Sequence, residues 1–188
     1  MNLDFERKEE INYSIIIPHK NSTVLLERCL KSIPCRKDVQ VIVVDDNSEN
    51  QEELNAVVGG FSQVELILTQ GGGAGHARNE GLKYIRGKWV LFADADDFYN
   101  KNAFSILDNY INSDNDVIYF FANSLDVNTL LPTPREKDLQ NIYEKYDSDN
   151  IRSADYIRFK IWAPWIKMIR SDFWFKFPIF FVEIPFGN

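Results

Sequence analysis

The stretch Lys88-Trp89-Val90-Leu91-Phe92-Ala93-Asp94-Ala95-Asp96-Asp97 joins a short apolar run to three carboxylates within four residues. Its first part, residues 88–93, has the length and the aromatic and β-branched content of a buried strand, and Gly87 precedes it. In an open α/β sheet, ligands bind at the carboxyl ends of the strands, which is where these acids fall. The stretch therefore predicts a strand that leads into a functional site.

The three acids themselves point to a cation. Carboxylates this close repel one another, so they persist at low cost only when they are solvated, protonated or neutralised. Because alternate side chains of an extended chain share one side, we expect Asp94 and Asp96 to point the same way and to suit Mg²⁺ or Mn²⁺. An acidic turn after a strand is the alternative interpretation. A calcium loop is excluded, because Phe98 and Tyr99 stand where a polar ligand and a glycine are needed.

Composition restricts what this strand can belong to. The chain has 188 residues, 45% of them hydrophobic and 26% charged, which is typical of one globular domain. The polar N-terminus and the lack of any membrane-length apolar run predict a cytoplasmic protein without a transmembrane segment, and we allow it a peripheral position at the inner face of the membrane. We expect Cys29 and Cys35 to be reduced, structural thiols.

The net charge of −7 argues against a nucleic-acid surface, which needs Lys and Arg to neutralise phosphates. An acidic protein that binds an anionic ligand also needs a metal, a helix N-terminus or a local arginine.

Upstream of the acids, strands and helices are expected to alternate. Apolar runs without alternation predict strands covered on both faces at residues 13–18 and 39–44, with a further strand at 64–68. Helical spacing predicts helices from Ser22 or Thr23 to Pro34 and over 51–58. This order is the pattern of a parallel sheet with right-handed crossovers.

A glycine-rich loop, Gly71-Gly72-Gly73-Ala74-Gly75, then runs into a helix that we expect to end near Gly87. It matches neither the dinucleotide fingerprint nor the Walker loop. Ala74, Ala77 and Gly81 are small enough to pack closely on the sheet. Arg78 lies in the first turns, where a cation opposes the helix dipole, so we expect it to meet an anion or an acid. A plain surface arginine is the alternative.

Four motifs together resemble the nucleotide-sugar half of the family 2 glycosyltransferases of the GT-A fold. They are Ser14-Ile15-Ile16-Ile17-Pro18 with Asn21, then Val41-Ile42-Val43-Val44-Asp45-Asp46-Asn47-Ser48, then Gly75-His76-Ala77-Arg78-Asn79-Glu80-Gly81, and then residues 87–97. Their order and spacing both match. The resemblance implies a three-layer α/β/α GT-A domain with a mostly parallel central sheet, in which residues 13–97 form the nucleotide-sugar-binding half and residues 98–188 the acceptor-side half.

The resemblance also implies roles for individual residues. Asp94 and Asp96 would face the ribose and the diphosphate, with Asp96 as the most direct ligand of Mn²⁺ or Mg²⁺. The sequence departs from the family at His19-Lys20, which leaves the identity of the nucleotide open. The candidate donor-binding residues are Pro18, Lys20, Asn21, Asp45, Asp46, Gly75, Arg78 and Asp94, and the candidate catalytic residues are Asp96, Asp97 and Glu183.

The second half carries weaker signals. We expect an amphipathic helix over residues 102–111, a strand over 116–121 and loops between 122 and 150. The last third is crowded with aromatic residues, which we assign to packing, apart from Trp162 and Trp165 in the acceptor groove. The aromatic face is also a candidate surface for homo-oligomer formation. Residues 181–188 resemble the family segment that leads to the catalytic base just after Gly-Asn, so we expect a C-terminally truncated chain.

These patterns predict an inverting, metal-dependent transferase that moves a monosaccharide from a UDP-sugar or similar donor to a hydroxyl of a glycan or lipid-linked acceptor. Two alternatives stay open. A nucleotidyltransferase would share the α/β sheet, but its glycine-rich loop directly after the first strand is missing. A non-catalytic interaction domain is the other alternative, and the aromatic C-terminus supports it.

Overall fold

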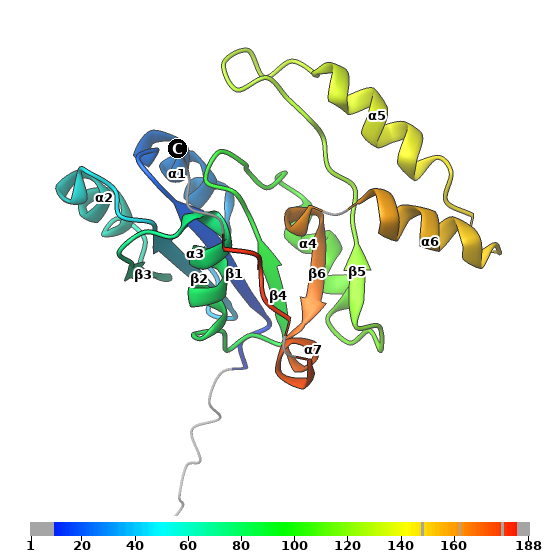
Figure 1. Cartoon of the computed structure of the whole chain (residues 1–188), viewed down its shortest axis with the longest axis horizontal. Coiled ribbons are helices and arrows are strands. Elements are labelled where there is room, and N and C mark those ends of the chain that lie inside the picture. The colour runs from blue at the N-terminus through cyan, green and yellow to red at the C-terminus, as the bar shows by residue number, and fades with distance from the viewer. Residues whose placement is uncertain (1–9, 148, 162, 178, 184–188) are drawn as a thin grey trace, which may run out of the picture.

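In the residues that the computed structural model describes (10–147, 149–161, 163–177 and 179–183), six strands form one mixed sheet in the order β3-β2-β1-β4-β6-β5 (Figure 1). The first four of these strands are parallel, and β6 runs antiparallel to both β4 and β5. The strands are β1 (Tyr13–His19), β2 (Val39–Asp45), β3 (Val64–Leu68), β4 (Trp89–Phe92), β5 (Val117–Tyr119) and β6 (Lys167–Arg170).

Helices cover both faces of this sheet, as the unbroken apolar strands predict. One core places Ile15, Val41 and Leu91 against α1 (Thr23–Ser32), α2 (Gln51–Val58) and α4 (Ala103–Leu107). The opposite core places Ile16 and Phe92 against α3 (Gly73–Leu82). The predicted α/β fold with three layers is therefore confirmed, with the antiparallel β6 inserted between β4 and β5.

Small residues bring α3 close to the sheet. Ala77 is fully buried, and a Cβ at Gly81 would lie 2.6 Å from Ile16 Cγ2. The preceding turn needs glycine as well, because Gly71, Gly72 and Gly73 have φ values of 97°, 142° and 85°. The expected helix ends earlier than predicted, at Leu82, and turns lead from there to Gly87.

The acceptor-side half contains a helix where we expected loops. α5 (Pro134–Tyr143) starts with proline at a position where no backbone N–H is needed, so this proline begins a helix instead of marking a loop. It contacts α6 (Ile151–Lys160), and Figure 1 shows both beyond β5, at one end of the sheet. A short 3₁₀ turn, η1 (Asp108–Tyr110), extends α4, and another, η2 (Pro164–Ile166), precedes β6.

The chain then crosses the molecule again. α7 (Ser171–Lys176) follows β6, and the segment after it runs back beside α3 (Figure 1). Trp174 and Phe181 from this region pack on Phe92, with ring centroids 5.8 and 5.1 Å away. They complete the core that α3 alone leaves open over β4.

The expectation for the two cysteines has a mixed outcome. Both cysteines are free, and Cys29 is buried as expected for a structural thiol, but Cys35 is exposed because it lies beyond the end of α1. Among the helices that the structure describes, none combines the length and the apolar character needed to span a bilayer.

Candidate active site

The carboxyl ends of three adjacent strands bring the candidate residues to one edge of the sheet. His19 and Asp45 are register partners at the ends of β1 and β2. Ile16 pairs with Phe92 at the end of β4, and the Ala93 N–H still donates to the Ile16 carbonyl at 3.1 Å. The acidic residues that follow Ala93 therefore leave the sheet beside the loop that follows β1.

Asp94, Asp96 and Asp97 form an acidic cluster, with one carboxylate oxygen from each lying within 4.8 Å of the others. The geometry that produces it differs from the extended chain we expected. The chain turns after Ala93, and the Asp97 N–H donates to the Asp94 carbonyl at 2.9 Å. The turn brings Asp97 into the cluster. In an extended chain, the Asp97 side chain would point to the side opposite Asp94 and Asp96.

The environment of Asp97 opposes its negative charge. Burial, followed by the charges of Asp94 and Asp96, raises the pKa of Asp97 to about 6, although Arg135 acts in the opposite direction. The Asp97 carboxylate also accepts the Asp94 N–H at 3.4 Å. A bound cation would offset the repulsion from Asp94 and Asp96, which adds to the effect of burial on this pKa, and three hard oxygen ligands suit Mg²⁺ or Mn²⁺.

Arg78 meets one acid of the cluster, as its position in α3 predicts. Its Nη2 donates to Asp94 Oδ1 at 2.5 Å, and the Arg78 side chain is 13% exposed. The guanidinium lies 5.5 Å from the centroid of the Phe181 ring. Its Nε is buried and has no hydrogen-bond partner among the described residues, so one donor of this arginine is unused.

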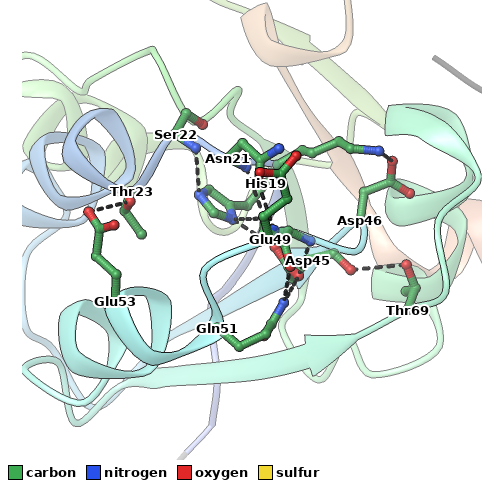
Figure 2. Close-up of polar contacts among 12 residues, drawn as sticks. His19, Asn21, Ser22, Thr23, Asp45, Asp46, Glu49, Gln51, Glu53 and Thr69 are labelled. Atoms are coloured by element: carbon green, nitrogen blue, oxygen red, sulfur yellow. Dashed lines mark hydrogen bonds and ion pairs between the residues drawn. The ribbon is translucent and has the colours of Figure 1, made fainter. Parts of the chain in front are cut away.

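Asp45 is the centre of a buried network at the ends of β1 and β2 (Figure 2). One of its oxygens bonds His19 Nδ1 at 2.8 Å and accepts the Ser48 hydroxyl, while the other accepts the Ser48 N–H and Gln51 Nε2. His19 Nε2 accepts the Ser22 N–H at 3.2 Å, so in neutral His19 the proton lies on Nδ1 and is donated to Asp45.

Asp45 is consequently a scaffold residue in this structure. Burial opposes its charge, but hydrogen bonds from Ser48, Gln51 and His19 hold the pKa of Asp45 below its usual value. The network ties the start of α1 to the loop after β2, because the Asn21 N–H also donates to Ser48 Oγ. Asn21 and Asn47 both adopt positive φ, which asparagine tolerates better than most residues.

Asp46, also buried, links two other loops. One of its oxygens accepts the Gly73 N–H at the start of α3, and the other lies 3.5 Å from Lys20 Nζ, whose side chain is 42% exposed. Pro18 is half-buried one residue before His19. The structure therefore places Pro18, Lys20, Asn21 and Asp46 around the loop after β1, where the Lys20 side chain is partly exposed.

Gly75 and Glu183 lie together on the outer side of α3. A Cβ at Gly75 would collide with the Val182 carbonyl oxygen, so the backbone that approaches this glycine is the chain's own. Glu183 accepts Asn79 Nδ2 at 2.8 Å and lies 3.3 Å from His76 Nδ1. Hydrogen bonds from Asn79 and His76 lower its pKa. Glu183 does not belong to the acidic cluster.

Trp162 and Trp165 are the tryptophans predicted to line the acceptor groove. Trp162 lies outside the described residues. Trp165 is partly buried and packs on a small core that contains Ile157 and Ile166, and the Arg135 guanidinium lies 5.4 Å from its ring centroid. A role of Trp165 in the acceptor groove therefore stays a prediction.

Sequence reasoning missed several residues of this edge. His19, Ser48 and Gln51 hold Asp45, and Arg28 donates to the Asp96 carbonyl at 2.5 Å. Ser48 could have been found, because a serine three residues after an aspartate often closes a local turn. The contact of Arg28 with Asp96 joins positions 68 residues apart and has no local signal.

Comparisons with known proteins identify the family and the fold. Residues 14–173 match the sequence profile of glycosyl transferase family 2. The uncharacterized glycosyltransferase EpsJ of Bacillus subtilis is 25% identical over 177 residues, which cover 90% of this chain and 51% of EpsJ. The poly(ribitol-phosphate) β-N-acetylglucosaminyltransferase TarS of Staphylococcus aureus is 38% identical over 106 residues, covering 50% of this chain and 18% of TarS.

The crystal structure of S. aureus TarS 1–349 in complex with UDP-GlcNAc superposes with a TM-score of 0.65 at 23% identity, over 92% of this chain and 49% of that one. This likeness shows the shared fold. The chain spans about half the length of the curated relatives it matches, or less.

Proposed function

This chain belongs to glycosyl transferase family 2, and on that premise we propose that it transfers a monosaccharide from a UDP-sugar to a hydroxyl group of a glycan or lipid-linked acceptor. The observation that carries the proposal is the acidic cluster at the end of β4, held by Arg78 at the same sheet edge as the loop after β1. This edge is where open α/β sheets bind their ligands.

The acidic cluster is suited to hold a divalent cation. Three carboxylates with oxygens within 4.8 Å of one another, one of them with a raised pKa, form a set of hard ligands whose combined charge the single ion pair with Arg78 offsets only in part. Asp94 and Asp96 would hold Mn²⁺ or Mg²⁺, with Asp97 beside them. The ion would supply the charge that stabilises a departing diphosphate.

The protein's own residues have distinct roles in this proposal. Arg78 fixes the direction of Asp94 and offsets part of the charge of the acidic cluster. The His19–Asp45 network holds the loop after β1 against the loop after β2, beside the place proposed for the nucleoside. Lys20 lies in the loop after β1, and Asp46 approaches it from the loop after β2.

We propose UDP-GlcNAc as the first donor to test, because TarS was crystallised with it. Inversion at the sugar would need in-line attack by the acceptor hydroxyl and a carboxylate that takes its proton. Asp97 and Glu183 are the candidates for that carboxylate. Asp97→Asn and Glu183→Gln, each assayed for sugar transfer, separate them.

Residues 13–97 would form the nucleotide-sugar half of one GT-A domain, and residues 98–188 the acceptor half. Exposed Phe175, Phe177 and Phe180 support the further proposal that the aromatic C-terminal face joins copies of the chain. Light scattering after gel filtration would show a mass that falls when Phe175 and Phe180 are both changed to serine.

The decisive experiment is metal-linked donor binding. At ~100 times its dissociation constant, UDP with excess Mn²⁺ should stabilise the fold by about 2.7 kcal/mol, a shift visible in thermal melting. Asp96→Asn should remove most of this shift, whereas Asp114→Asn, at an exposed acid outside the cluster, should keep it. A full shift in EDTA, or an unchanged shift in Asp96→Asn, would contradict the metal role of Asp96.

The products separate this activity from the two alternatives. Release of free UDP from UDP-GlcNAc, with or without acceptor, supports a glycosyltransferase. Release of pyrophosphate from UTP and a sugar phosphate would support a nucleotidyltransferase instead. Nucleotide binding without either product would favour an interaction domain.

A further inference from the structure

Asn79 joins α3 to the end of the described chain. Its side-chain amide makes two hydrogen bonds with the backbone of Phe181. Nδ2 donates to the Phe181 carbonyl at 3.0 Å, and Oδ1 accepts the Phe181 N–H at 2.8 Å. The second Nδ2 hydrogen is donated to Glu183 at 2.8 Å. Asn79 is only 8% exposed, so its hydrogen-bonding capacity is spent on this segment. We call residues 179–183 the terminal strap.

The fit of the strap on α3 is specific at two more points. The Val182 carbonyl occupies the space that a side chain at position 75 would fill, so Gly75 permits the crossing. Glu183 bonds both Asn79 and His76, one turn apart on α3. These contacts come from one face of α3 and place the strap across its N-terminal half.

Phe181 carries the effect of the strap inward. Its ring lies 5.1 Å from Phe92, the last residue of β4, and stacks at 5.9 Å on Trp174. The guanidinium of Arg78 lies 5.5 Å from the Phe181 centroid and bonds Asp94. The aromatic ring thus restricts the arginine that orients one acid of the cluster.

We infer that Asn79 is a positioning residue for the donor site, which clamps the terminal strap so that Phe181 holds Arg78 against Asp94. The inference rests on the proposed function, because Arg78 and Asp94 matter to a ligand only if the acidic cluster binds the donor. It assigns Asn79 and Gly75 to strap docking rather than to contact with the nucleotide. It also makes donor affinity depend on a segment about 100 residues away in the sequence.

The test uses two variants that release the strap by different means. Asn79→Ala removes the amide clamp, and Gly75→Ala obstructs the Val182 carbonyl while leaving Asn79 in place. Asn55→Ala is the matched control, because Asn55 is exposed on α2 and its side-chain amide donates to the Gln51 carbonyl within the same helix. Hydrogen–deuterium exchange of a peptide spanning the strap reports its release independently of any activity. Calorimetry with UDP and Mn²⁺ reports donor affinity.

We expect faster exchange of the strap in both variants and a UDP affinity lowered about threefold to tenfold, the effect of freeing one or two ordered side chains. Melting temperature should fall by a similar amount in both variants, because each releases Phe181 from its packing on Phe92. Asn79→Gln, whose longer amide retains the same donors and acceptor, should recover part of the affinity, which a general packing defect would not allow.

Three results would overturn the inference. In the first, hydrogen–deuterium exchange of the strap stays slow in both variants. In the second, exchange becomes faster but UDP affinity is unchanged. In the third, exchange becomes faster and UDP binds more tightly, which would mean that the strap obstructs the site. If the wild-type chain binds no UDP with Mn²⁺, it is the proposed function that fails. If the wild type binds UDP and both variants bind it equally well, only the positioning role of Asn79 is contradicted.

Discussion

Asp97→Asn should stabilise the metal-free protein, although it removes an acid from the candidate site. The pKa of Asp97 is about 6 in the folded chain, against 3.8 for an ordinary aspartate. The folded state therefore holds the Asp97 proton more tightly than the unfolded state, and ionisation costs stability as pH rises from 4 to 6. The pKa difference of ~2.2 between the folded and unfolded states corresponds to a loss of about 3 kcal/mol in the free energy of unfolding. This loss is complete above pH 7.

Asparagine has nearly the same shape and keeps an oxygen that can accept the Asp94 N–H, so the charge is the main change. In EDTA at pH 7.5, urea unfolding should show Asp97→Asn to be more stable than the wild type by up to about 3 kcal/mol. At pH 4 the same linkage relation leaves only about 0.5 kcal/mol. Asp114→Asn is the matched control and should change the free energy of unfolding little at either pH.

Adding Mn²⁺ at pH 7.5 should reduce or reverse the advantage of Asp97→Asn, because a cation neutralises the cluster in the wild type. A variant that is no more stable than the wild type in EDTA at pH 7.5 would refute the argument. It would mean that the Asp97 carboxylate is solvated well enough to stay ionised without cost.

Three further substitutions test other parts of the structure. Asp45→Asn should lower the free energy of unfolding by about 2–4 kcal/mol, because Ser48, Gln51 and His19 all donate to a carboxylate that is fully buried. A loss below about 1 kcal/mol in urea unfolding would count against the scaffold role of Asp45. Arg78→Gln should weaken UDP binding with Mn²⁺ by about 1.5–3 kcal/mol in calorimetry, with little change in melting temperature; wild-type affinity together with a large drop in melting temperature would make Arg78 purely structural. Gly81→Ala should cost about 1–3 kcal/mol of stability, because its Cβ would lie 2.6 Å from Ile16, and a neutral result in thermal melting would show that α3 can move away from the sheet.

The sequence by itself predicts the nucleotide-binding half almost element by element. Apolar runs without alternation identify β1 and β2 as strands covered on both faces, length and composition identify β4 as a buried strand, and the two cores confirm this. The acids after β4 and the arginine in α3 are recognisable because each departs from what its local structure would favour. In the second half, α5 was missed because Pro134 and the polar residues around it are as typical of loops as of a helix start.

Only the tertiary structure decides which of these residues meet. The turn after β4 brings Asp97 into the acidic cluster, and the packing of α3 brings Arg78 to Asp94 across 16 residues. The Asn79 clamp, the reason for glycine at position 75 and the position of Glu183 all depend on where the terminal strap crosses α3. Periodicity and propensity act over a few neighbouring residues and so determine the elements, whereas contacts between distant segments follow from packing, which no local pattern records.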